Sequence, residues 1–208
     1  GRRTTDDILS DLKHVPNGII GCGYLEATKE NVSFLTEAGR VNYFIYRDPR
    51  DMLVSQVFFA TDMHEEHGMH AYYNSLPDFG ARLNVAITGI DKDGLKMVSV
   101  KQRYEGVFQW LEQKNVMCLR FEDLINNRDV TLNAMLDEVE KTGYKIPTLR
   151  EKALSILVDA IQPKKSHTFR SGKTGGWKEH FTEEHKKLFK DVAEDLLVRL
   201  GYEKNNDW

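Results

Sequence analysis

The sequence lacks any run of about 18 consecutive apolar residues, the length that a membrane-spanning helix needs. Its opening residues, GRRTTDDILSDL, do not contain the apolar stretch of a secretion signal. The net charge of −3 argues against nucleic-acid binding, which needs a broad basic face. Internal repeats and low-complexity tracts are also missing. We therefore expect a single globular domain over residues 1–208, with no membrane or nucleic-acid partner.

Cysteine is scarce, with two residues in the chain, Cys22 and Cys118. Both lie in short apolar runs that are typical of buried strands, GIIGC (18–22) and VMCLRF (116–121). Two buried free thiols are typical of a reducing compartment, so we expect a cytoplasmic protein.

Helix and strand signals alternate along the chain, and this alternation predicts an α/β fold. VNYFIY (41–46) is apolar apart from one asparagine, as expected of a fully buried parallel strand. Together with 18–22 and 116–121 it predicts a central parallel sheet with helices on both faces. The predicted helices cover residues 5–14, 28–38, 49–60, 64–73, 78–90, 95–113, 130–142 and 149–161, and a last helix begins at Thr182 and ends before Gly201.

One segment departs from the acidic balance of the chain. Five cations and no acid lie between Lys164 and Lys178. Within this region, three glycines of FRSGKTGGWKEHFT (169–182) would let backbone N–H groups come close to an anion. The pattern indicates a phosphate site, and the alternative is a solvated surface loop.

A second anion-binding pattern lies in YFIYRDPRDMLVSQ (43–56). Arg47 follows the predicted strand, and ligands of open α/β sheets bind beyond the carboxyl ends of the strands. The helix that begins at Pro49 aims its N-terminal dipole and N–H groups into the same region. Arg47 can grip a phosphate with two parallel hydrogen bonds, and Ser55 can add a hydroxyl. The alternatives are an ion pair of Arg47 with a nearby aspartate and a solvent-facing serine.

Together these segments resemble the PAPS-dependent sulfotransferase family. Its members transfer a sulfuryl group from 3′-phosphoadenosine 5′-phosphosulfate (PAPS) to a hydroxyl or amine. YRDPRDMLVS is similar to the middle motif of the family, and RSGKTGGWKEHFT to its C-terminal motif. The resemblance implies that the 3′-phosphate of the nucleotide is bound by Arg47, Ser55, Arg170, Ser171 and Gly172.

The same resemblance extends to LRFEDL (119–124), which is similar to the strand end that lies near the adenine and so implicates Phe121. Its two acids are adjacent on the predicted strand, where neighbours point to opposite faces, so we expect no joint acid–base role for Glu122 and Asp123. The implied fold is the P-loop-kinase-like sulfotransferase fold. The implied donor is PAPS, with 3′,5′-adenosine bisphosphate (PAP) as product and no metal. The acceptor is a small molecule, and the oligomeric state stays open, a homodimer included.

The match to the family is incomplete in three respects. The family holds the 5′-phosphosulfate with an N-terminal strand and a loop of the type P-K/R-S-G-T-T, which this sequence lacks. We therefore expect a sulfotransferase domain without that first element, and the alternative is a degenerate homologue that binds the nucleotide without transfer. Tyr24 takes the position of the family's catalytic histidine, and tyrosine is a poor base at neutral pH unless it is activated. Ser171 replaces the usual lysine.

A weaker alternative comes from DMHEEHGMH (62–70). His64, His67 and His70 recur every three residues, which suggests a metal-dependent hydrolase. On a helix this spacing lets at most two of them share an ion well, and it does not match H-E-x-x-H. The sequence therefore predicts no metal site.

Overall fold

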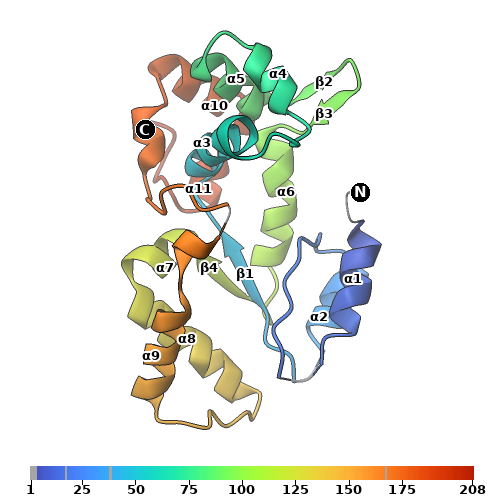
Figure 1. The fold of residues 1–208 in the computed structure, drawn as a ribbon, viewed down its shortest axis with the longest axis vertical. Helices are drawn as coiled ribbons and strands as arrows, with labels where there is room; N and C mark the ends of the chain where they lie inside the picture. Colours follow the sequence, from blue (N-terminus) through green and yellow to red (C-terminus); the bar gives the residue numbers. More distant parts are fainter. Residues whose placement is uncertain (1–3, 17, 38, 167) are drawn as a thin grey trace.

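Figure 1 shows the computed structural model, which describes residues 4–16, 18–37, 39–166 and 168–208. At its centre β1 (Tyr43–Tyr46) pairs in parallel with β4 (Met117–Arg120), in a register that sets Tyr46 opposite Arg120. A second, antiparallel sheet is the hairpin of β2 (Ile90–Lys92) and β3 (Leu95–Met97). The expected α/β class with a parallel sheet is confirmed, and two strands make up this sheet in the described part of the chain.

Helices surround the strand pair. Figure 1 shows α3, α4, α5 and α10 gathered beyond the ends of the strands, with α1 and α2 to one side below and α8 and α9 to the other. None of the helices in the described residues is long and apolar enough to cross a membrane. The helices are α1 (Thr5–Lys13), α2 (Lys29–Leu35), α3 (Pro49–Phe58), the π-helix η1 (Phe59–Met63), α4 (His70–Ser75), α5 (Phe79–Thr88), α6 (Val100–Leu111), α7 (Phe121–Asn126), α8 (Arg128–Lys141), α9 (Arg150–Ala160), the 3₁₀ helices η2 (Pro163–Lys165) and η3 (Gly176–Glu179), α10 (Glu183–Ala193) and α11 (Leu196–Arg199).

The hydrophobic core lies where α3 packs against α5 and η3, and α5 packs against α10. Leu53 and Val57 of α3, Leu83 and Ile87 of α5 and Phe189 of α10 are all at most 1 % exposed. Burial of each such side chain stabilises the fold by about 1.5–3 kcal/mol. This core fixes α3, and with it the segment that follows β1.

The start of α3 follows the expected local chemistry. Pro49 is its first residue, and the carboxylate of Asp48 accepts the backbone N–H of Arg50 at 2.9 Å. Because Asp48 already accepts the N–H of Arg50, that N–H group is not available to an external anion. The stop at Gly201 is also confirmed, with a left-handed φ of 71°.

The strand expected at 18–22 is wrong. This segment has no regular structure, and Cys22 is exposed rather than buried. A Cβ at Gly21 would lie 2.7 Å from Leu12, and one at Gly23 would lie 2.4 Å from Ile8. The glycines therefore serve a close approach to α1, and the segment packs on that helix instead of joining the sheet. Cys118 is half-buried in β4, and the structure describes both thiols as free.

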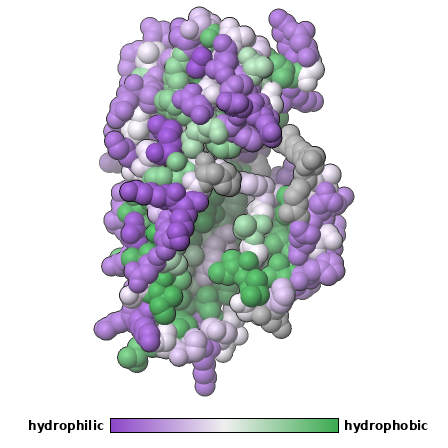
Figure 2. All heavy atoms as spheres, viewed as in Figure 1, coloured by the Kyte–Doolittle hydropathy of each residue, from purple (hydrophilic) through white to green (hydrophobic). Residues whose placement is uncertain are grey.

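Strand β1 is parallel as predicted, but the expectation that it is fully buried is wrong. Ile45 in its middle is 52 % exposed. On the face drawn in Figure 2, apolar side chains gather in the lower part of the molecule, where they line a hollow between the two lower groups of helices. Ile45 is exposed because a parallel sheet needs cover on both faces, and a pair of strands has few neighbours to supply it.

Three predicted helices differ from the observed ones. Residues 95–113 contain β3 and α6, because Asp93 and Gly94 both adopt positive φ and turn the chain into a hairpin. Within 64–73 the helix begins at His70. The last helix is divided into α10 and α11 at Glu194, whose φ is 52°, a conformation that interrupts helical hydrogen bonding.

Candidate anion-binding site

Arg47 lies between the end of β1 and the start of α3. Its Nη2 donates to the carbonyl oxygen of Lys173 at 2.9 Å and lies 3.6 Å from a carboxylate oxygen of Asp51. Its Cζ lies 4.8 Å from the centre of the Phe121 ring. Its Nε is buried and has no hydrogen-bond partner among the described residues. A buried N–H without a partner is costly, and the rest of the Arg47 side chain is partly exposed, so this side chain is suited to receive an anion.

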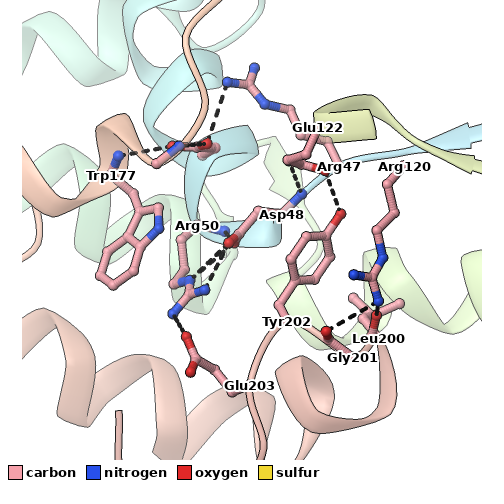
Figure 3. A network of polar contacts seen from close by, with 12 residues as sticks. Arg47, Asp48, Arg50, Arg120, Glu122, Trp177, Leu200, Gly201, Tyr202 and Glu203 are labelled. Atoms are coloured by element: carbon pink, nitrogen blue, oxygen red, sulfur yellow. Dashed lines mark hydrogen bonds and ion pairs between the residues drawn. The ribbon is translucent and has the colours of Figure 1, made fainter. Parts of the chain in front are cut away.

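Asp51 joins the two anion-binding patterns of the sequence. One carboxylate oxygen accepts the N–H of Gly175 at 2.7 Å, and the other accepts the N–H of Trp177 at 2.8 Å. Gly175 has a φ of 74°, the left-handed conformation that favours glycine. The loop of residues 172–177 is therefore fixed on the first turns of α3, beside Arg47 (Figure 3).

The other expected phosphate ligands are Ser55 on α3 and the loop residues Ser171 and Gly172. Ser55 is half-buried one turn after Asp51 on α3, and residues at this spacing share a helix face. Gly172 has a φ of 61°, and a Cβ there would lie 2.9 Å from the Phe169 ring, so the turn requires glycine. Ser171 accepts the N–H of Lys173 at 3.5 Å, a long contact.

Arg170 is directed elsewhere. Its Cζ lies 4.3 Å from the centre of the Phe58 ring, at the end of α3 opposite to Arg47. The nine steps from Pro49 to Phe58 correspond to roughly 13 Å along a helix axis. The structure thus brings Arg47, Phe121 and the backbone of the loop together, and it leaves the Arg170 guanidinium apart from them.

Tyr24 is 93 % exposed in the segment between α1 and α2. The side chain of Tyr24 is therefore open to solvent, and its role as a base stays a prediction.

The histidines of the 62–70 segment do not converge. His70 Nδ1 lies 2.9 Å from the carbonyl oxygen of Ala60, and its Nε2 lies 3.1 Å from the amide nitrogen of Asn74. The rings of His64 and His67 are 6.3 Å apart and nearly perpendicular. Among the described residues, no group of three or more histidine, cysteine or acidic side chains could hold a metal ion. The hydrolase alternative has no metal site there.

Glu122 has a role that the sequence analysis missed. Phe121 opens α7 rather than ending a strand, so Glu122 and Asp123 lie in the first turn of a helix. Glu122 accepts the backbone N–H of Asp48 at 3.0 Å and the hydroxyl of Tyr202 at 2.8 Å (Figure 3). Burial, followed by this hydrogen bond, raises the pKa of Tyr202. One carboxylate therefore ties the end of β4 to the start of α3 and to the C-terminal residues.

Arg50 is the second residue that the motifs did not reveal. It is 3 % exposed, and its Nε and Nη2 donate to the carboxylate of Asp48 at 3.0 and 2.7 Å. Its Nη1 donates to Glu203 at 2.6 Å. Burial raises the pKa of Asp48, and the contacts with Arg50 offset part of that effect.

These features can be compared with known proteins. A family model described as a sulfotransferase domain matches residues 31–201, which is most of the chain. No curated protein matches the chain.

Solved structures match over most of this chain. A crystal structure of retinol dehydratase with androsterone and the inactive cofactor PAP gives a TM-score of 0.63 at 18 % identity, over 90 % of this chain and 56 % of that one. Mouse sulfotransferase SULT7A1 complexed with PAP gives 0.63 at 15 % identity, over 93 % and 70 %. Retinol dehydratase with retinol and PAP gives 0.55 at 20 % identity, over 76 % and 48 %. The chain thus spans about half of retinol dehydratase and about two-thirds of SULT7A1. At such identities the solved structures support the fold, and the match of the domain model shows that the chain belongs to the sulfotransferase family.

Proposed function

We propose that this chain binds PAPS and acts in sulfuryl transfer to a hydroxyl or amine of a small-molecule acceptor. The observation that carries the proposal is the state of Arg47. Its buried Nε has no partner in the described residues, and its guanidinium lies against the Phe121 ring and the loop of the C-terminal motif. The family match and the PAP-bound neighbours support the same donor.

The residues around Arg47 suit the 3′-phosphate end of the nucleotide. A guanidinium can form two parallel hydrogen bonds with phosphate, each worth roughly 1.5–3 kcal/mol. Ser55 lies on the same helix face as Asp51, and the aromatic ring of Phe121 would support an adenine by stacking. Arg170 would join this site after leaving the Phe58 ring.

In this proposal the protein acts by positioning. The bound donor would supply the sulfuryl group, and Arg47 with the 172–177 loop would hold the opposite end of the nucleotide. Binding energy from a remote phosphate fixes the place of the reacting end and so contributes to transfer. The acceptor would be a small hydroxyl-bearing molecule, of the kind that retinol dehydratase binds in its complexes with androsterone and retinol.

A titration with PAP tests the donor site. We expect calorimetry to show binding by the wild type, with affinity at least tenfold lower for Arg47→Ala and for Arg170→Ala. Lys145→Ala is the matched control, because it removes the same charge from an exposed position in the connection between α8 and α9, outside the basic segment. Equal affinities in all four proteins would refute the assignment.

A non-catalytic nucleotide-binding function is the second candidate. It is favoured by the exposure of Tyr24, the residue at the position that the resemblance assigns to the family's catalytic histidine. An assay of sulfuryl transfer from PAPS to a panel of hydroxylated acceptors separates the two candidates. Binding of PAP with transfer supports the enzyme, and binding without transfer supports the second function.

A further inference from the structure

Arg50 is a buried cation that is not among the residues proposed to bind the phosphate. Its hydrogen bonds to Asp48 and Glu203 join the start of α3 to the segment of residues 202–208. Asp48 and Arg50 are 6 % and 3 % exposed, whereas the Glu203 side chain is 26 % exposed. The segment 202–208 therefore supplies the outer partner of an otherwise buried ion pair (Figure 3).

Two tryptophans complete the surroundings of this guanidinium. Cζ of Arg50 lies 3.9 Å from the centre of a ring of Trp177 and 4.6 Å from that of Trp208. The two indoles meet at 90°, with 5.7 Å between their ring centres. Arg50 thus fills the corner between two perpendicular rings, an arrangement that attracts a cation to both.

Trp208 is itself held in place. Its ring contacts Phe189 of α10 at 5.7 Å between centres, and its backbone carbonyl oxygen accepts a hydrogen bond from Lys190 at 2.8 Å. The corner is therefore fixed on one side by α10 and the 202–208 segment. The other side is Trp177, which belongs to the loop.

Trp177 links this corner to the proposed phosphate site. Its backbone N–H is one of the two that Asp51 accepts, and its side chain is 6 % exposed. Two residues before it, the N–H of Gly175 is held by the same carboxylate. The backbone carbonyl oxygen of Lys173 accepts the hydrogen bond from Arg47. A displaced Trp177 ring would pull its own backbone N–H from Asp51, and Asp51 also holds Gly175 of the same loop, so the loop would lose its position beside Arg47.

We propose that Glu203 and Trp208 are positioning residues for recognition of a 3′-phosphate. They hold Arg50 against Trp177, and Trp177 holds the 172–177 loop at Arg47. The inference rests on the proposed function and adds a specificity to it. The preference for adenosine 3′,5′-bisphosphate over adenosine 5′-phosphate depends on side chains of the 202–208 segment that do not touch the nucleotide.

The test compares affinities for PAP and for adenosine 5′-phosphate, which lacks the 3′-phosphate. For Trp208→Ala we expect PAP affinity to fall about tenfold and adenosine 5′-phosphate affinity to stay within twofold of the wild type. Trp208→Phe keeps an aromatic face for Arg50 and should recover most of the preference. Tyr144→Ala, which removes a half-exposed ring from the α8–α9 connection, is the control and should leave the ratio unchanged.

An unchanged ratio of PAP affinity to adenosine 5′-phosphate affinity in Trp208→Ala, whether both affinities fall equally or neither falls, would overturn the inference. A wild type that binds PAP no better than adenosine 5′-phosphate would instead refute the proposed function. Should Trp208→Ala fail to fold, Glu203→Gln decides. It keeps the shape of the side chain and removes the charge that pairs with Arg50, so the ratio should fall at least threefold, and an unchanged ratio contradicts the inference.

Discussion

Arg47 and Phe121 each follow the last paired residue of a strand in the central sheet. Tyr46 is paired with Arg120 across the parallel strands, and the next residue of each strand leaves the sheet at its carboxyl end. The guanidinium of Arg47 therefore lies 4.8 Å from the centre of the Phe121 ring. Two segments far apart in the sequence become one candidate site because parallel strands end together.

The Phe121 ring is expected to contribute to nucleotide affinity. Phe121→Leu keeps an apolar side chain but removes the aromatic face below Arg47, a contact worth about 0.5–2 kcal/mol. We expect PAP affinity to fall three- to tenfold in calorimetric titration. Phe121→Tyr retains the ring and serves as the control. A leucine variant that binds as the wild type does would exclude a role for this ring.

Asp51 is expected to hold the loop rather than bind the nucleotide. Asp51→Ala removes two buried hydrogen bonds to the N–H groups of Gly175 and Trp177, at roughly 1.5–3 kcal/mol for each bond to a charged group. We expect the free energy of unfolding in urea to fall by about 3 kcal/mol, and limited proteolysis to cut the 172–177 loop sooner. Asp191→Ala, an exposed change on α10, is the control. An unchanged cleavage rate in the loop would contradict this role.

The sequence predicted the parts of the fold that local chemistry determines. Asp48 and Pro49 define the start of α3, and Gly201 defines the end of α11. The β2–β3 hairpin was missed although Asp93 and Gly94 form a typical turn pair, because the apolar spacing of residues 95–113 also fits a helix. The segment 18–22 has the composition of a strand and lacks a partner strand.

The candidate site was predictable to the extent that its residues lie in linear motifs. Arg47 and the 172–177 loop carry recognisable glycine and arginine patterns, and the structure brings them together. The interactions of Arg50 with Glu203 and Trp208 depend on how α3 and the 202–208 segment pack, and single-sequence patterns contain no signal for such packing. The position of the Arg170 side chain is likewise determined by the Phe58 ring that happens to lie beneath it.

Gly201 is expected to be required for stability. Its φ of 71° strains any other residue, and a Cβ there would lie 2.5 Å from Nη2 of Arg120, which donates to the carbonyl oxygens of Leu200 and Gly201 (Figure 3). We expect Gly201→Ala to lower the free energy of unfolding by about 2–4 kcal/mol.

Gly143→Ala is the matched control for that change, because its φ of 86° is also left-handed and no atom lies within 4 Å of the added Cβ. It should show the backbone strain alone, about 1 kcal/mol. Urea unfolding of both variants measures the difference. Equal losses would mean that the contact with Arg120 can relax at no cost.

His180 is expected to make stability depend on pH. Burial, and then the nearby Arg170 guanidinium, lower its pKa below the ordinary value of 6.5. The native protein binds fewer protons at His180 than the unfolded chain does. The contribution of His180 to stability is therefore fully present above about pH 6.5, and it is lost as the pH falls towards the lower pKa of the native state. Urea midpoints between pH 5 and 8 should show this slope in the wild type, and His180→Gln should flatten it.

The same histidine reports on Arg170. In Arg170→Ala the burial of His180 against Phe58 and Phe79 remains, with ring centres 5.3 and 4.9 Å away, but the repulsion by the guanidinium is gone. The pKa of His180 should therefore rise towards its ordinary value, which an NMR titration of its ring protons measures. Saturating PAP should cause a rise in the wild type as well, since the proposed site draws Arg170 away from the Phe58 ring. A titration curve that is the same with and without PAP would mean that Arg170 stays on Phe58 and takes no part in binding.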